Sequence, residues 1–234
     1  MADTGTEIHQ LLEMVANNLR LALSERQFQQ LAMHFALLLR WNEKINLTAI
    51  RKPEAIATRH FEESLFLTTL IKPPDGLLVD VGSGAGFPGL PLKIAWPAVE
   101  TVLLEPNNKK ASFLKEAIRQ CGLERIEVRT ERLEDTVRGN LAGRAALVTL
   151  RALAPTGGLL AALEALLAPA GQLALFLGSS EASVVAAGWA APVPSAPPFV
   201  WQAPSPLPRS ERRVILIGQR HADAAGHETV ANTP

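Results

Sequence analysis

A glycine-rich stretch is the part of the sequence best suited to chemistry. "VDVGSGAGFPG", residues 79–89, follows an apolar run and has four glycines within eight positions. Glycine allows positive φ angles and close approach of a ligand to the backbone. A helix that begins after such a turn also presents free N–H groups to an anionic group. The stretch therefore predicts a turn between a strand and a helix that binds an anionic or zwitterionic ligand.

Two registers of these glycines fit two different ligands. Gly84, Gly86 and Gly89 satisfy G-x-G-x-x-G, the dinucleotide fingerprint. Gly82, Gly84 and Gly86, preceded by Asp80, give D-x-G-x-G-x-G, which resembles motif I of Rossmann-like methyltransferases. In the dinucleotide register the first glycine should follow the strand directly, and Asp80 would repel a pyrophosphate. Because Asp80 suits an ammonium or sulfonium group, we favour S-adenosylmethionine, with an NAD-dependent oxidoreductase as the alternative.

Two charged residues lie at the ends of other expected strands. Glu105 closes the second strand, 19 residues after Gly86, where a carboxylate can accept hydrogen bonds from ribose hydroxyls. Arg151 ends the fourth strand and could bind a phosphate or a substrate carbonyl, or form a structural salt bridge. The first position supports a nucleotide-like ligand, whereas the second stays open between a substrate contact and a structural role.

The residues also exclude some kinds of methyl transfer. Cys121 lies near a helix end, away from the strand termini, so no cysteine nucleophile is available for methylation of a base carbon. The sequence "RALAP" at residues 151–155 lacks the Asn/Asp-Pro-Pro-aromatic loop that methylation of an exocyclic amine commonly uses. The chemistry that remains is attack by a nitrogen lone pair without a proton, such as guanine N7, which requires alignment but no general base.

The elements that must position these residues alternate between strands and helices. This pattern calls for a mainly parallel sheet with helices on both faces and a ligand at the carboxyl ends of the strands. Ser24 and Gln27 form an expected capping box, and Pro53 suits a helix start. We expect strands at 77–81, 100–105, 126–130, 145–150, 172–177 and 212–220, and helices at 24–41, 53–71, 88–95, 107–121 and 156–168.

The domain organisation follows from these elements. Residues 1–72 form an N-terminal helical extension, residues 73–220 the sheet domain, and residues 221–234 a disordered tail. The proline-rich stretch at 191–208 predicts a surface loop rather than a strand interior. A length of 234 residues with 47% hydrophobic residues is enough for one core with a small extension.

Composition limits the setting and the partners. The single cysteine allows no internal disulfide, and the acidic N-terminus lacks the apolar segment of a signal peptide, so we expect a cytoplasmic protein. Neither a membrane span nor metal-ligand spacing is evident. A formal net charge of zero argues against non-specific binding to nucleic acid, although residues 40–60 and 104–151 are each net basic.

Several motifs together resemble one family. "WNEKINLTAI", "RHFEESL", "VDVGSGAGFPGLPLKI", "NKKASFL", "TERLED" and "LRALA" match, in order and spacing, the small-subunit ribosomal RNA methyltransferase G family, also called glucose-inhibited division protein B. The resemblance covers about residues 35–220. It implies a Rossmann-like class I methyltransferase sheet, mostly parallel with an antiparallel C-terminal strand. It also implies transfer of a methyl group from S-adenosylmethionine to guanine N7 in 16S ribosomal RNA of the small ribosomal subunit, by a protein that we expect to be monomeric.

The resemblance also implies site residues. His60 and Ser64 lie in a helix expected to face the site. Glu63 replaces the usual aspartate of the family's H-x-x-D-S segment, and Leu177 replaces a usual lysine, which leaves open a non-catalytic RNA-binding or ribosome-assembly factor. The expected catalytic residue is Arg151, and the expected cofactor contacts are Gly82, Gly84, Gly86, Phe87, Glu105, Leu133, Glu134 and Arg151.

Overall fold

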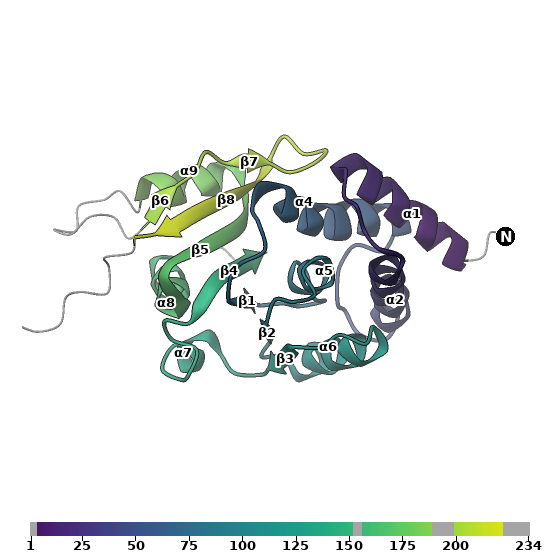
Figure 1. Ribbon diagram of the computed structural model, residues 1–234, viewed down its shortest axis with the longest axis horizontal. Helices are drawn as coiled ribbons and strands as arrows, with labels where there is room; N and C mark the ends of the chain where they lie inside the picture. The colour runs from purple at the N-terminus through teal and green to yellow at the C-terminus, as the bar shows by residue number, and fades with distance from the viewer. Residues whose placement is uncertain (1–3, 152–155, 189–198, 222–234) are drawn as a thin grey trace, which may run out of the picture.

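The computed structural model describes residues 4–151, 156–188 and 199–221 of the chain. These residues form an eight-stranded sheet with helices on both faces (Figure 1). The strand order is β3-β2-β1-β4-β5-β8-β6, and β7 also pairs with β8. The strands are β1 (Leu77–Val81), β2 (Thr101–Leu104), β3 (Ile126–Arg129), β4 (Ala145–Arg151), β5 (Leu167–Gly178), β6 (Phe199–Trp201), β7 (Ser205–Pro206) and β8 (Arg213–Arg220).

The sheet is parallel except at one edge. Strands β1 to β5 pair in parallel, and β8 runs antiparallel to β5, with Leu175 opposite Leu216. The predicted mostly parallel sheet with an antiparallel C-terminal strand is therefore confirmed. Its order reverses direction between β1 and β4, because β2 and β3 lie on one side of β1 and the later strands on the other. Ligands of such sheets bind at this reversal, beyond the carboxyl ends of the strands.

Helices cover the two faces in separate layers. Figure 1 shows α8 and α9 on one side of the sheet and α4, α5 and α6 on the other, with α1 and α2 outside the second layer. The helices are α1 (Thr4–Leu19), α2 (Glu25–Asn42), α3 (Pro53–Ile56), the π-helical segment η1 (Ala57–Glu62), α4 (Glu63–Leu70), α5 (Gly89–Ala95), α6 (Asn108–Gln120), α7 (Leu133–Thr136), α8 (Gly157–Leu166) and α9 (Ser179–Gly188).

The helices expected before the sheet are present. Ser24 caps α2 in a capping box, since its side chain accepts from the Gln27 N–H and the Gln27 side chain accepts from the Ser24 N–H. The helix expected from Pro53 forms as α3, η1 and α4 without a break. Helix α1 was not among the expected elements, although Ile8, Leu12 and their neighbours give it a buried face.

Two boundaries differ from the expectation. Helix α8 ends at Leu166 and β5 begins at Leu167, because the strand extends through Pro169 and Gly171 toward its partner β4. The expectation that the proline-rich stretch forms only a surface loop was wrong at β6 and β7, two short strands at the edge of the sheet. An edge strand tolerates proline because one side of its backbone needs no partner. The rest of that stretch up to residue 198, and the expected tail from residue 222, lie outside the described residues.

The alternation of β1 decides which side chains face which helix layer. Leu77, Val79 and Val81 join the core beneath α8 and α9, whereas Leu78 joins the core beneath α4 and α5. Asp80 has the parity of Leu78 and therefore points toward α5. A third core joins the N-terminal helices to α5 and α6 around Phe35 and Phe113. This packing fixes the N-terminal helices against the sheet domain.

Candidate functional site

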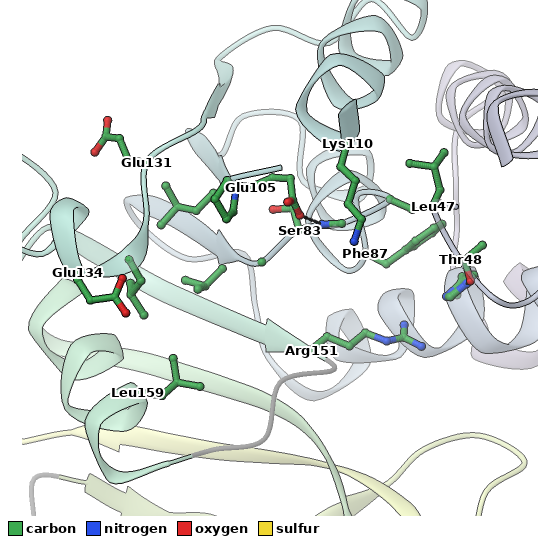
Figure 2. Close-up of a pocket in the computed structure, with 18 residues that line it drawn as sticks. Leu47, Thr48, Ser83, Phe87, Glu105, Lys110, Glu131, Glu134, Arg151 and Leu159 are labelled. Atoms are coloured by element: carbon green, nitrogen blue, oxygen red, sulfur yellow. Dashed lines mark hydrogen bonds between the residues drawn. The ribbon is translucent and has the colours of Figure 1, made fainter. Parts of the chain in front are cut away.

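A cavity of about 520 Å³ opens at the carboxyl ends of the central strands. The ends of β1, β2 and β4 contribute Val81, Leu104 and Arg151, and the segment between α2 and α3 closes the opposite side. Figure 2 shows side chains from both sides directed into this space. Its lining comprises Leu47, Thr48, His60, Val81, Gly82, Ser83, Gly84, Ala85, Phe87, Leu104, Glu105, Pro106, Lys110, Glu131, Leu133, Glu134, Arg151 and Leu159.

The glycine loop forms one wall with its backbone. The N–H groups of Gly82 and Ser83 donate to the Leu104 carbonyl at 2.9 and 3.1 Å, which attaches the loop to the end of β2. Gly84 has φ +57°, a left-handed conformation that disfavours other residues. A Cβ built there would meet only the Gly82 carbonyl oxygen within 4 Å, at 3.8 Å. The bare backbone at Gly84 therefore leaves space in the cavity for a ligand.

Gly86 has a different task from the other loop glycines. It does not line the cavity, although it was an expected cofactor contact. A Cβ at this position would lie 2.4 Å from Leu90 Cδ1 and 3.2 Å from Leu114 Cδ2, and the residue has φ +87°. Gly86 thus allows the start of α5 to approach α6 closely. Gly89 also stands outside the lining, so the dinucleotide register places only Gly84 at the cavity.

Asp80 does not face the ligand space, and the expectation that it accompanies an ammonium or sulfonium group was wrong. Strand alternation turns its side chain toward α5, where Oδ2 accepts from the Gly89 N–H at 3.2 Å and Oδ1 from the Thr149 hydroxyl at 2.7 Å. Burial raises the pKa of Asp80 to about 6, against the effect of these hydrogen bonds. The carboxyl group links β1 to β4 and to the first turn of α5.

Glu105 lies where the sequence placed it, at the end of β2. Its Oε2 accepts from the Gly84 N–H at 2.8 Å, and its Oε1 accepts from the Asn107 N–H at 2.9 Å. The side chain therefore holds the loop, while the remaining lone pairs of the carboxylate are available to a ligand in the cavity. The dashed line in Figure 2 marks the contact between Glu105 and the loop.

Aromatic rings support the far end of the loop. Phe87 stacks against His34 at 4.8 Å between ring centroids and against His60 at 4.6 Å. His34 Nε2 lies 2.9 Å from the Ala85 carbonyl, to which a neutral imidazole protonated at Nε2 donates. Burial lowers the pKa of His34 to about 4. The N-terminal helix α2 thus takes part directly in holding the glycine loop.

His60 and Thr48 form the wall opposite β1. His60 Nε2 lies 2.8 Å from Thr48 Oγ1, and the N–H groups of Leu47 and Thr48 donate to Asn42 Oδ1 at 2.9 and 3.0 Å. The side chain of Asn42 thereby fixes the "NLT" turn. Burial lowers the pKa of His60 to about 3, and the charge of Arg151 acts in the same direction. At neutral pH the imidazole is uncharged.

Arg151 lies at the lip of the cavity and is held from behind by the π-helical segment. Its Nη2 donates to the Arg59 carbonyl and to Glu63 Oε2, the latter at 3.0 Å. Its Nη1 is buried and has no hydrogen-bond partner among the described residues. Figure 2 shows the side chain extending along the cavity toward the side that carries Thr48. The protein therefore fixes the guanidinium through Nη2, whereas Nη1 has unused hydrogen-bond donors.

Glu63 forms ion pairs with several arginines behind this lip. Besides Arg151, it pairs through Oε1 with Arg59 Nε at 3.3 Å and with Arg213 Nη1. Its side chain is only 2% exposed, whereas those of Arg151, Arg213 and Arg59 are 15%, 24% and 48% exposed, so the carboxylate is buried and the arginines reach toward solvent. The glutamate that departs from the family's usual aspartate is thus the centre of a cluster of three arginines.

Most expected site residues meet at the cavity, and several others were missed. Leu133 and Glu134 line it from the start of α7, and Lys110 and Leu159 reach it from α6 and α8 (Figure 2). The motif "NKKASFL" contains two adjacent lysines, Lys109 and Lys110, and the sequence alone did not indicate that Lys110 is the one that lines the cavity. Thr48 was part of a quoted motif without an assigned role. The other residues without an expected role are Leu47, Val81, Ser83, Ala85, Leu104, Pro106 and Glu131.

Ser64 and Leu177 also lie outside the cavity. Ser64 is buried, and its hydroxyl donates to the His60 carbonyl at 2.6 Å within the helix. Leu177 is 4% exposed and packs in the core of β5, opposite Val214 of β8. The residue that replaces a usual lysine of the family is therefore a core residue here and does not line the cavity.

Within residues 4–151, 156–188 and 199–221, no group of three or more His, Cys, Asp or Glu side chains is arranged to hold a metal ion. None of the helices described over these ranges is both long and apolar enough to cross a membrane.

The fold is that of the class I methyltransferases, with a mostly parallel sheet and an antiparallel strand β8. The chain is similar in fold to a solved S-adenosylmethionine-dependent methyltransferase from Aquifex aeolicus, with a TM-score of 0.58, 14% sequence identity, and coverage of 75% of this chain and 97% of that one. Of the two glycine registers, only the methyltransferase register places two of its glycines, Gly82 and Gly84, at the cavity.

Sequence comparison identifies the family. The family model described as rRNA small subunit methyltransferase G matches residues 27–190, and the chain belongs to this family. It is 39% identical over 167 residues to ribosomal RNA small subunit methyltransferase G of Halorhodospira halophila, which covers 71% of this chain and 77% of the relative. It is 41% identical over 162 residues to the protein of that name from Stenotrophomonas maltophilia, covering 68% and 74%.

Proposed function

We propose that this protein transfers the methyl group of S-adenosylmethionine to N7 of a guanosine in 16S ribosomal RNA of the small ribosomal subunit, in the cytoplasm. The observation that carries the proposal is the cavity at the carboxyl ends of β1, β2 and β4 in a chain that matches this methyltransferase family over residues 27–190. The alternative of an NAD-dependent oxidoreductase has no support from the family match.

The residues present fit S-adenosylmethionine. The space that a Cβ at Gly84 would occupy suits the amino acid part of such a ligand. Glu105 keeps lone pairs for two ribose hydroxyls while its other contacts hold the loop. Leu133 and Glu134, at the start of α7, would contact the adenine. When bound, S-adenosylmethionine supplies an electrophilic methyl group on a sulfonium leaving group.

One side of the cavity carries Thr48, His60 and Arg151, and we call it the acceptor side. It suits a base that needs no deprotonation. Guanine N7 carries a lone pair and no proton, so alignment is the main requirement of the step. The imidazole of His60, which lines this space, is a weak proton acceptor because burial lowers its pKa to about 3. Glu105 is committed to the loop. The side chains around this space are therefore suited to orienting a base rather than to removing a proton from it.

Arg151 has the role of a donor to the acceptor base. Its Nη1 is buried at the cavity lip and has no partner among the described residues. The guanine edge that exposes N7 also exposes the O6 acceptor, which arginine can bind. A donor at O6 would hold the base with N7 directed into the cavity, and would stabilise charge on the ring as the new bond forms.

The test is methyl transfer to a defined nucleotide. Purified protein would be incubated with labelled S-adenosylmethionine and with small ribosomal subunits from cells that lack the modification, and the modified base would then be mapped. We expect label at N7 of one guanosine of 16S ribosomal RNA. Label on another atom would contradict the acceptor, and calorimetric binding of NAD instead of S-adenosylhomocysteine would contradict the cofactor.

The same assay separates the enzyme from a non-catalytic RNA-binding or ribosome-assembly factor with this fold. Such a factor would bind S-adenosylhomocysteine and ribosomal subunits but would transfer no methyl group. The replacement of a usual family lysine by Leu177 motivated this alternative. Because Leu177 lies in the core of β5, its identity gives no reason to expect a loss of activity.

A further inference from the structure

An arginine-rich groove lies beside the acceptor side of the cavity. It has a volume of about 740 Å³ and lies between η1 and the loop that joins β7 to β8. Figure 1 shows this loop beside α4. The charged residues lining the groove are Arg59, Arg209, Arg212, Arg213 and Glu211. This surface, which we call the arginine groove, has no part in the cofactor site described above.

The arginine groove and the cavity share a wall. Glu63 pairs with Arg151, which lines the cavity, and also with Arg59 and Arg213, which line the groove. The next carboxylate in the helix, Glu62, pairs with Arg209 at 3.3 Å. Two buried carboxylates therefore anchor these arginines, and Arg59 of the groove is in contact with Arg151 of the cavity through the Arg59 carbonyl.

The groove keeps a surplus of positive charge and of hydrogen-bond donors. Glu63 cannot neutralise three guanidinium groups, and Arg59 and Arg209 remain 48% and 55% exposed. Arg212 is exposed, and its side chain has no ion pair or hydrogen bond with any residue that the structure describes. Each guanidinium has five N–H donors, most of which the protein leaves unused. Glu211 is the exposed carboxylate of the groove and opposes this charge.

We propose that the arginine groove binds backbone phosphates of the RNA strand whose base enters the cavity. Guanidinium groups match the geometry of phosphate oxygens and bind them through paired hydrogen bonds. A strand that places one base in the cavity must run its neighbouring phosphates past the cavity lip, where the groove lies. The proposal rests on the proposed function, because it takes RNA as the substrate. It adds a second contact surface outside the reaction site.

This assignment predicts which quantities the groove controls. Phosphate contacts fix the position of a nucleic acid and contribute salt-dependent affinity, but they do not read its sequence. Substitutions in the groove should therefore change RNA affinity and the KM for RNA. They should leave the affinity for S-adenosylhomocysteine unchanged, since none of the four groove arginines lines the cavity.

The experiment uses Arg212, which can be changed without breaking an ion pair of the protein. The affinity of the full chain for small ribosomal subunits would be measured over a series of KCl concentrations. We expect Arg212→Ala to weaken binding by about fivefold, the upper end for an exposed ion pair. The slope of log K against log salt should fall by about 0.7 for the lost contact with single-stranded RNA. Glu211→Gln should have the opposite effect and tighten binding.

A matched control is available at the other end of the central strands. Arg26 is exposed in the first turn of α2, next to Gln27, whose side chain donates to the carbonyls of Ile94 and Ala95 at the end of α5. Helix α5 begins after the glycine loop and runs away from the cavity, so its end lies far from the cavity lip. Arg26→Ala removes the same charge and should leave RNA affinity at the wild-type value. Calorimetry with S-adenosylhomocysteine and thermal unfolding would show that each variant is folded.

The outcomes separate this proposal from the proposed function. Wild-type affinity and salt slope in both Arg212→Ala and Glu211→Gln would overturn the proposal. A photocrosslinking amino acid at position 212 should label 16S ribosomal RNA in the complex, and crosslinks to a ribosomal protein alone would overturn the choice of RNA. If the expected changes in affinity occur but the wild-type protein transfers no methyl group, the groove stands and the proposed function fails.

Discussion

The two sides of the cavity are built in different ways. On the proposed cofactor side, backbone N–H groups, glycines and one carboxylate form the wall, and the central contact joins Gly84 to Glu105, 21 residues apart. On the proposed acceptor side, charged side chains from distant segments meet, because Glu63 contacts Arg151 and Arg213 across 88 and 150 residues. One side depends on local chain geometry, and the other depends on the assembled fold.

This difference decides what each side can tolerate. A backbone wall fails when any side chain enters it or when the left-handed conformation becomes costly. A cluster of buried charges fails when one partner is removed, because the remaining charge is left without compensation. Substitutions on the cofactor side should therefore affect ligand binding first, whereas those on the acceptor side should affect stability and turnover first.

The largest effect is expected for Gly84→Val. The valine would need φ +57°, and its branched side chain would fill the space that the ligand requires. We expect the affinity for S-adenosylhomocysteine to fall by more than about 1000-fold, equivalent to about 4 kcal/mol. Isothermal titration calorimetry measures this loss directly.

Gly122→Val is the matched control for that loss. Gly122 also has φ +57°, but it follows α6 and no atom lies within 4 Å of a Cβ built there. The Gly122→Val variant should therefore lose stability through the same backbone strain but keep wild-type affinity for S-adenosylhomocysteine. Equal losses of affinity in the two variants would show that backbone strain, and not occupation of the cavity, is responsible.

The next effect is expected on the acceptor side, for Glu63→Gln. The substitution leaves Arg151 and Arg213 without their shared, buried carboxylate. We expect the free energy of unfolding to decrease by about 3 kcal/mol, the lower end for breaking a buried ion pair. Urea denaturation at neutral pH measures it, and the affinity for S-adenosylhomocysteine should fall far less.

Glu63→Asp tests whether charge or length matters at this position. The family usually has aspartate there, and the shorter side chain keeps the negative charge. We expect it to retain more than half of the stability that Glu63→Gln loses. A loss as large as that of the glutamine variant would mean that the cluster depends on the reach of glutamate rather than on its charge.

Arg151→Ala should have a smaller effect on stability and a selective effect on turnover. Glu63 keeps Arg59 and Arg213 as partners in this variant. Loss of one donor at a reacting group costs about 100-fold in kcat, whereas the affinity for S-adenosylhomocysteine should change by less than about threefold, or 0.7 kcal/mol. Arg151→Lys keeps the charge without the planar fork and should recover only part of the rate. Equal losses in affinity and kcat would contradict a contact at the substrate edge.

The geometry of the proposed cofactor side could be predicted from the sequence because its residues are close together in the chain. Strand periodicity and the density of glycines located the turn after β1, and Glu105 followed from the end of the next strand. The misplaced residue was Asp80, whose type suited a ligand but whose position in the strand directs it toward α5. The pattern of residue types indicated the loop correctly, and only the parity of the strand determined where one side chain points.

The acceptor side was predicted only in part, for a physical reason. The family resemblance pointed to Arg151 and to the helix of His60, but the contact of Glu63 with Arg213 requires β8 to lie beside the helix that carries Glu63. No local spacing encodes that contact. Likewise, the contact of His34 with the Ala85 carbonyl joins α2 to the loop across 51 residues, and no motif marks His34 as a partner of the loop.

The smallest effect concerns this contact between α2 and the loop, through pH. Burial lowers the pKa of His34 to about 4, so the unfolded chain takes up a proton near pH 6.5 before the folded protein does. Stability is therefore lost as pH falls from 6.5 to 4, and His60 adds a loss of the same sign down to about pH 3. Asp80 opposes them, because its raised pKa of about 6 gives the folded state an extra proton between about pH 4 and 6.

His34→Gln removes the contribution of His34 to the pH dependence of stability. Glutamine can still donate to the Ala85 carbonyl but does not titrate, so the decrease in unfolding free energy below pH 6.5 should become shallower by about 1.4 kcal/mol per pH unit. Urea denaturation at pH 7 and pH 5.5 measures the change. Parallel pH profiles for wild type and His34→Gln would mean that His34 is not held uncharged at the loop. The contact between α2 and the loop would then position the loop but would not make stability depend on pH as a buried imidazole should.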